Sequence, residues 1–109
     1  MPDYTLSKVD GAPISKERAD LLMQRFRDKH PGKETVVARF IGTDQINNIL
    51  GQGNCVGLRI YFGYDDNGQL DVFLIGALAN GNNIGPIGSQ GPQTGIMSDQ
   101  TMPCPPYCP

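Results

Sequence analysis

The residues best suited to chemistry are two cysteines near the C-terminus, Cys104 and Cys108, which flank the segment Pro-Pro-Tyr. In an extended polyproline conformation, which rises about 3.1 Å per residue, their Cα atoms would lie roughly 12 Å apart, too far for a disulfide bond. A turn at Pro105-Pro106 must therefore intervene. With such a turn, the pair can form a small, comparatively reducible disulfide or chelate a thiophilic metal.

A tetrahedral metal site would need both thiols together with the other two soft ligands of the chain, His30 and Cys55. The sequence favours a simpler interpretation of each ligand. Cys55 is a small apolar residue at the start of a strand, and His30 interacts with carbonyl groups at the end of a helix, while the tail thiols stay reduced. We therefore predict no metal and no cofactor, and a disulfide between Cys104 and Cys108 stays open as an alternative.

Arg59 and Tyr61 are candidate binding residues on a strand. They alternate with a series of apolar residues, namely Val56, Leu58, Ile60 and Phe62. Because successive strand residues point to opposite faces, Arg59 and Tyr61 lie on the face opposite that series. We predict them as exposed contact residues, since Arg and Tyr are frequent among interface hot spots. The alternative is ordinary packing under the tail or a helix. With Cys104, Tyr107 and Cys108, they make up the predicted binding residues.

Signatures of enzymes are missing. The sequence has no G-x-S-x-G nucleophile turn, no phosphate-binding P-loop and no H-E-x-x-H motif, and its single histidine would have to serve any histidine-dependent mechanism alone. The run Asp65-Asp66-Asn67-Gly68 resembles part of a calcium loop, but a hairpin turn explains it. We predict no catalytic residue, and the sequence favours a protein that is not an enzyme.

Charge and hydropathy exclude further classes of partner. The 109 residues include 9 Lys+Arg and 11 Asp+Glu, a formal net charge of −2, without the basic excess that phosphate backbones require. No apolar run approaches the roughly 20 residues that span a bilayer, and the N-terminal residues do not resemble a secretory signal. We predict no nucleic-acid partner, no membrane partner and a cytoplasmic location, where three cysteines would normally stay reduced.

Two helices and a strand come first among the elements that must position these residues. Ser15 is placed to cap a helix over residues 16–30, where apolar residues recur every three or four positions before Pro31-Gly32 ends it. The β-branched run 35–41 predicts a strand. Thr43 or Asp44 then caps a short helix, which glycines end at residue 51.

A β-hairpin is the clearest element. Two apolar strands, 56–63 and 70–78, are joined by a turn at Asn67-Gly68, where both residues tolerate positive φ. The second strand is apolar on both faces, which predicts a place in the centre of the sheet. The fold class is therefore α+β, with a small antiparallel sheet of a strand plus a hairpin packed against one or two helices. Residues 1–79 form a single domain with its core at about 14–79, and residues 80–109 form a Gly-, Pro- and Asn-rich tail ending in CPPYC.

The hairpin and tail together resemble a set of small uncharacterised bacterial proteins with a GVGIR-type strand, a following apolar strand and a Cys-Pro-rich C-terminus. The segments that carry this likeness are Cys55–Gly63, Val72–Gly76 and Pro103–Cys108. No activity is known for those proteins. The resemblance therefore implies only that strand and tail belong together.

These observations lead to two hypotheses of function. The first is a non-enzymatic protein-interaction or accessory module, whose tail either covers its own sheet or presents itself to a protein partner. The alternative is a thiol-based redox or zinc-binding element centred on CPPYC. Self-association is also possible, because a tail with few charged residues can pack on a second copy of the chain.

Overall fold

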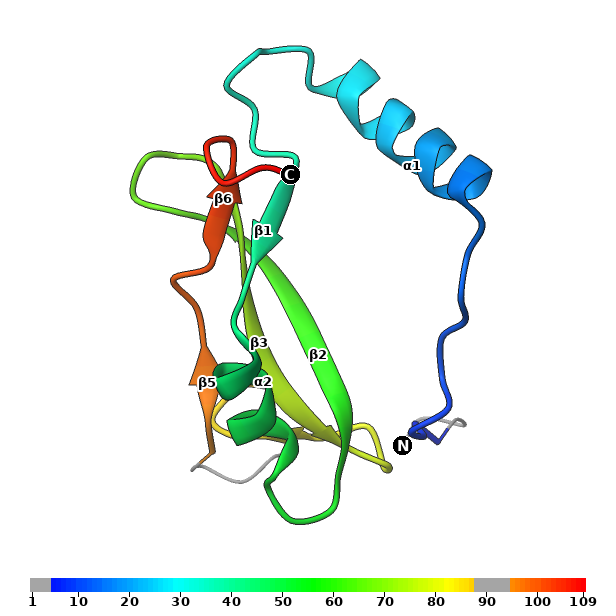
Figure 1. Cartoon of the computed structure of the whole chain (residues 1–109). Coiled ribbons are helices and arrows are strands. Elements are labelled where there is room, and N and C mark those ends of the chain that lie inside the picture. The colour runs from blue at the N-terminus through cyan, green and yellow to red at the C-terminus, as the bar shows by residue number, and fades with distance from the viewer. Residues whose placement is uncertain (1–4, 88–94) are drawn as a thin grey trace.

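The computed structural model describes residues 5–87 and 95–109 of the chain. Residues 1–4 of the expected domain and 88–94 of the expected tail lie outside this part. The described residues form two helices and antiparallel strands in two sheets, which confirms the α+β class (Figure 1). Neither of the helices in these two ranges has the length and apolar character needed to cross a membrane.

The predicted hairpin is confirmed as β2 (Cys55–Tyr64) and β3 (Leu70–Leu78). Its turn is stabilised by Asp65, whose carboxylate accepts the backbone N–H groups of Asn67 and Gln69, each at 2.9 Å. Gly68 follows with a φ of 76°, a left-handed conformation that favours glycine. The residues of the turn itself are therefore sufficient to predict it from the sequence.

β3 lies in the middle of the larger sheet, as its two apolar faces predict. It pairs with β2 along one edge, and with β4 (Asn83–Ile84) and β5 (Met97–Ser98) along the other. Ile75 at the centre of β3 is 0% exposed. The core of the molecule therefore forms around this strand.

The tail expected at residues 80–109 contributes strands to both sheets. Besides β4 and β5, it provides β6 (Met102–Cys104), which pairs with β1 (Ala38–Phe40) in a separate two-stranded sheet. Ile84 and Cys104 are buried with the rest of the core. The core thus extends past residue 79, and the strand expected at 35–41 is shorter and pairs with the tail instead of the hairpin. The reason is that the tail supplies backbone partners both to β1, through β6, and to the edge of β3 that β2 leaves unpaired, through β4 and β5.

α2 (Thr43–Leu50) packs closely against β3. Its Ile49 is fully buried, and the Ile49 Cγ2 atom would lie only 3.3 Å from a Cβ atom placed on Gly76. Glycine at position 76 therefore permits the close approach of helix and strand. The N-cap residue of α2 is Gly42, without a side-chain cap, so the expected cap at Thr43 or Asp44 is wrong by one or two residues.

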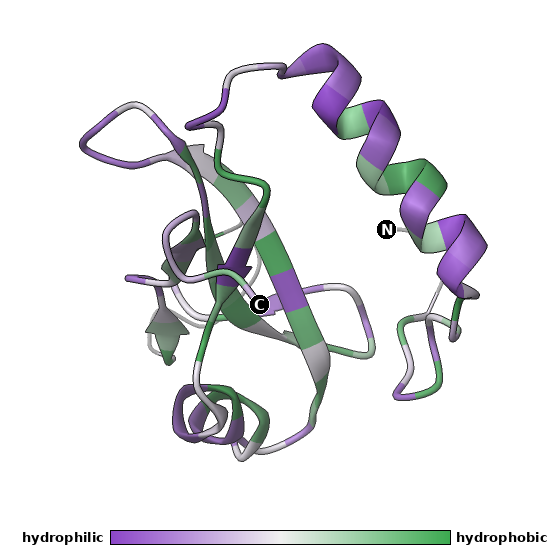
Figure 2. Cartoon of the chain, turned by 45° about the horizontal axis from the view of Figure 1, so that its top comes forward, coloured by the Kyte–Doolittle hydropathy of each residue, from purple (hydrophilic) through white to green (hydrophobic). Residues whose placement is uncertain are grey.

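α1 (Lys16–Lys29) begins as predicted at Ser15, whose hydroxyl accepts the backbone N–H of Arg18 at 3.1 Å. None of its 14 residues is buried. Figures 1 and 2 both show the helix standing apart from the sheet, on the side of β2. The core therefore does not begin near residue 14 as expected, because eight of the residues of α1 are charged and none of its apolar residues is buried.

Candidate interaction surface

Arg59 and Tyr61 of β2 are hydrogen-bonded to residues of the tail. The Arg59 guanidinium donates to the Gly81 carbonyl at 3.0 Å and to the side-chain oxygen of Asn83. The amide of Asn83 donates in turn to the Tyr61 hydroxyl at 2.8 Å and to the Ile87 carbonyl at 2.7 Å. Both β2 side chains are therefore half-buried, as the packing alternative predicted, and they do not form the freely exposed pair expected. Their contact with a partner stays a prediction.

A second arginine, Arg39 of β1, joins the two sheets. Its side chain is 10% exposed and donates to the carbonyls of Leu70 and Thr101, each at 3.1 Å. It forms an ion pair with Asp65 at 2.9 Å, and its Nε atom lies 3.6 Å from Asp71. The Asp71 carboxylate also accepts the Thr101 hydroxyl at 3.0 Å. Arg39 therefore has a structural role, and its isolated place in an apolar run gave no sequence signal for it.

The same contacts alter the titration of Asp65. The backbone N–H of Gln69, with further help from Arg39 and the backbone N–H of Asn67, holds the pKa of this carboxyl below its usual value. These groups favour the ionised form because each donates to, or carries a charge opposite to, the carboxylate. The hairpin turn is therefore linked electrostatically to β1.

The tail ends in a closed loop. Cys104 and Cys108 form a disulfide with their Cα atoms 4.7 Å apart. The turn expected at Pro105-Pro106 is present, and the Tyr107 N–H donates to the Pro103 carbonyl at 2.9 Å. Cys104 is buried against β1, whereas Cys108 and Tyr107 are exposed. The disulfide thus fixes the end of β6 and leaves Tyr107 accessible.

The structure does not assemble the tetrahedral site considered from the sequence. Within residues 5–87 and 95–109, no three His, Cys, Asp or Glu side chains are grouped as a metal ion requires. The free thiol of Cys55 donates to the Gly57 carbonyl at 3.2 Å. The backbone N–H of His30 donates to the Arg27 carbonyl at the end of α1, and its ring contacts Phe26 with centroids 4.5 Å apart.

The apolar face of the hairpin is open. Ile60 is 53% exposed and Phe62 is 74% exposed, although their place in the alternating apolar series would assign them to the core. An apolar groove of about 400 Å³ lies beside them, lined by residues of the hairpin, of β1 and of the segments around it. α1 contributes Phe26 to this lining. We call the exposed residues Ile60, Phe62 and Tyr64 together with this groove the open face.

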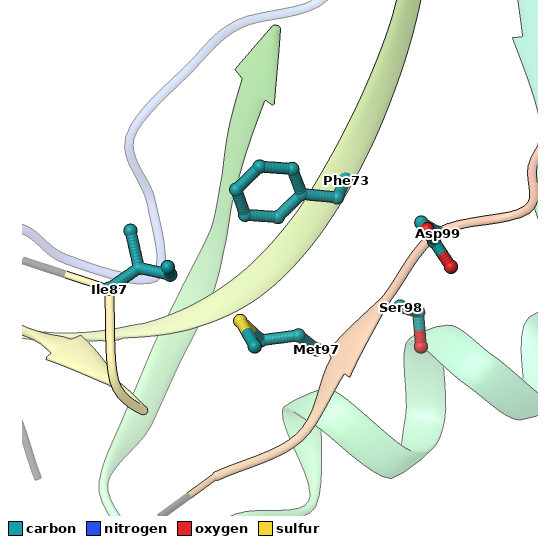
Figure 3. A pocket seen from close by; sticks show the side chains of 5 residues that line it. All are labelled: Phe73, Ile87, Met97, Ser98 and Asp99. Atoms are coloured by element: carbon teal, nitrogen blue, oxygen red, sulfur yellow. The ribbon is translucent and has the colours of Figure 1, made fainter. Parts of the chain in front are cut away.

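A smaller hollow of about 320 Å³ lies on the other side of β3. Figure 3 shows Phe73, Ile87 and Met97 pointing toward one another around it, with Ser98 and Asp99 at its margin. The Ser98 hydroxyl already donates to the side chain of Gln45 at 3.0 Å. The described residues that line the hollow therefore do not supply the convergent polar groups that usually orient a small-molecule ligand.

Sequence reasoning identified the strand, but it expected Arg59 and Tyr61 to be the exposed pair, whereas Ile60 and Phe62 are the more exposed residues. The period of two correctly separates Ile60 and Phe62 from Arg59 and Tyr61, because the cross-strand pairs Ile60–Leu74 and Tyr61–Phe73 lie on alternate positions of the ladder. Alternation does not say which face other segments will cover. That information lies in the tail, which has no regular pattern.

No family model, curated protein or solved structure matches this chain. The resemblance of the hairpin and tail to small uncharacterised bacterial proteins therefore stays a prediction. Function has to be argued from the geometry of the molecule.

Proposed function

We propose that this chain is a non-enzymatic protein-interaction module that binds its partner through the open face. The observation that carries the proposal is the exposure of Ile60, Phe62 and Tyr64, three large side chains on one strand at 53%, 74% and 79%. Single exposed apolar residues are ordinary, but a contiguous apolar patch on a folded domain marks an interaction site.

The surroundings of the patch support this interpretation. The groove beside it is walled by β1, which Arg39 holds against β3 and the tail through three carbonyl and carboxylate partners. A groove with fixed walls binds with less loss of conformational entropy than a flexible surface. Arg59 and Tyr61, by contrast, already have partners within the chain.

A site-specific photocrosslinker tests the proposal. We would place benzoylphenylalanine at Phe62 of the open face, and in a separate variant at Tyr107 of the tail loop, which is 58% exposed. We expect discrete adducts from position 62 that excess unlabelled wild-type chain suppresses and excess Phe62→Lys chain does not. Adducts from position 107 alone would place the interaction on the tail and contradict the proposal. No adduct from either position would also contradict it.

The thiol alternative is supported by a separate observation, the unequal exposure of the disulfide. Cys104 is 7% exposed whereas Cys108 is exposed, so an external thiolate reaches the Cys108 sulfur first. Attack there forms a mixed disulfide at Cys108 and releases the Cys104 thiolate. Titration of the protein with glutathione buffers of graded potential, followed by alkylation and mass spectrometry, would measure this exchange. Failure of the tail disulfide to exchange, while the core stays folded, would contradict the alternative.

A further inference from the structure

No strand of the described residues pairs with the outer edge of β2. In the described residues β2 is the terminal strand of the larger sheet and pairs only with β3. It is also long, with 10 residues, and its one register irregularity lies at its start, between Cys55 and Gly57. Natural edge strands are usually short or protected by lysine, proline or bulges, because unpaired N–H and C=O groups recruit another strand. β2 contains neither lysine nor proline.

We propose that β2 pairs in antiparallel orientation with β2 of a second copy of this chain, around a two-fold axis at Ile60. The two hairpins then form one continuous sheet across the dimer. This inference rests on the proposed function, since it names the partner of the open face. The occupant we commit to is a second copy because the sequence of β2 is complementary to itself.

The complementarity follows from the register. In a symmetric antiparallel pair, residues at equal distances from the central residue face each other, so an axis at Ile60 places Leu58 opposite Phe62 of the second copy. Ile60 faces its own equivalent on the same apolar face. On the other face Arg59 lies opposite Tyr61, a cation beside an aromatic ring. Gly57 faces Gly63, so the small residues also coincide.

The competing register is unfavourable. Two copies of a strand over residues 55–64 can pair along nearly their whole length only if the two-fold axis lies at Arg59 or at Ile60. An axis at Arg59 would place two guanidinium groups directly opposite each other, and like charges in that position destabilise a strand pair. Charge therefore selects Ile60 as the centre.

α1 supplies the area that strand pairing alone lacks. The helix stands on the side of β2, apart from the sheet (Figures 1 and 2), and its Leu21, Leu22 and Met23 are 44%, 42% and 44% exposed. Its Phe26 already lines the groove with Ile60 and Phe62. Two such helices over the joined strands would bury apolar surface of both copies, and a stable interface needs at least about 1,000 Å² in total.

Sedimentation velocity over a range of concentrations tests the dimer. We expect the wild-type chain to sediment as a dimer that dissociates on dilution. Ile60→Lys should raise the dissociation constant about a hundredfold or more, because it places two like charges across the axis. Tyr107→Lys is the matched control on the tail loop and should leave the constant unchanged. A wild-type monomer at every concentration, or dimerisation of Ile60→Lys equal to wild type, would overturn the inference.

Cysteine crosslinking tests the register and does not depend on the folding of Ile60→Lys. In a Cys55→Ser background under mild oxidation, Ile60→Cys should form a covalent dimer. Leu58→Cys alone and Phe62→Cys alone should each crosslink at least about tenfold more slowly than a mixture of the two variants. In the proposed register these two residues face each other across the dimer, and each lies four positions, or roughly 13 Å, from its own equivalent. Equal crosslinking of all single variants would overturn the proposed register.

The two proposals fail in different ways. A chain that stays monomeric but whose position 62 crosslinks to a different protein overturns the dimer and leaves the interaction module intact. A monomer whose position 62 crosslinks to nothing overturns both.

Discussion

The two faces of the β2–β3 hairpin come from one alternating sequence but differ in how the chain covers them. On one face, Arg59 and Tyr61 are bonded to Asn83 of the tail, and Ile75 is fully buried beside them. On the other face, Ile60 and Phe62 stay more than half exposed beside an apolar groove. The face that carries Arg59 and Tyr61 is therefore covered by the tail, and the face that carries Ile60 and Phe62 is exposed.

This difference shows that the segments which cover the hairpin, more than its hydropathy, decide which face stays exposed. An arginine side chain has five N–H donors, so a segment that packs over it has to supply hydrogen-bond acceptors. The tail does so with the Gly81 carbonyl and the Asn83 side chain. The apolar face makes no such demand on the chain and can be completed by another molecule.

The largest expected effect is a difference in the free energy of unfolding between a variant on the covered face and a variant on the open face. Ile75→Ala should lower the free energy of unfolding by about 2–5 kcal/mol, since it opens a cavity in a closed core. Phe62→Ala, measured in dilute solution where the chain is a monomer, should change it by less than about 0.5 kcal/mol because the ring is already in water. Urea denaturation of both variants gives the comparison. A similar loss for both would mean that the open face is closed in solution.

The next largest effect is expected at Asn83, whose side chain bonds the tail to Arg59 and Tyr61. Asn83→Ala should destabilise the chain by about 3 kcal/mol, because it removes one of the two acceptors of a half-buried guanidinium and the donor to a tyrosine hydroxyl. Asn48→Ala, at an exposed position of α2, is the matched control, with a change of less than about 0.5 kcal/mol expected. The same urea titrations measure both. Equal effects would show that the tail does not hold the hairpin through Asn83.

The elements that sequence predicted well are those with local causes. The hairpin turn follows from Asp65 and Gly68, and the start of α1 from the Ser15 cap, all within a few residues of the structure they determine. The α+β class follows from these elements. None of them needs knowledge of a distant segment.

The elements that sequence reasoning missed depend on distant partners. β1 is three residues long and pairs with β6, more than 60 positions later in the chain. β4 and β5 have two residues each, too short for any periodic pattern. Since these segments decide which hairpin face is covered, the sequence predicts the strand but not which of its faces stays exposed.

A smaller effect is expected at the wall of the groove. Cys108→Ser should lower the free energy of unfolding by about 2 kcal/mol, because the disulfide closes only a short loop. It should also speed amide exchange at Val37, whose N–H donates to the Cys104 carbonyl at 2.9 Å. Hydrogen exchange read by NMR would measure this, with the Ile75 amide as the internal control. Unchanged exchange at Val37 would show that β1 holds its place without the disulfide.

The smallest effect is electrostatic and links the hairpin turn to the same wall. The pKa of Asp65 is lowered in the folded chain by the Gln69 N–H and then by Arg39. Its stabilising contribution is therefore complete above the unfolded value of about 3.9 and is lost as the pH falls through the lower folded value. Asp65→Asn keeps an acceptor for the turn but loses the charge, so its stability should decline less than that of wild type below that pH. Urea midpoints from neutral pH into this acid range measure the decline, and Asp66→Asn, at an exposed neighbour, should follow wild type. If Asp65→Asn declines as steeply as wild type, the charge of Asp65 does not contribute to the acid sensitivity of the fold, and Arg39 holds β1 without it.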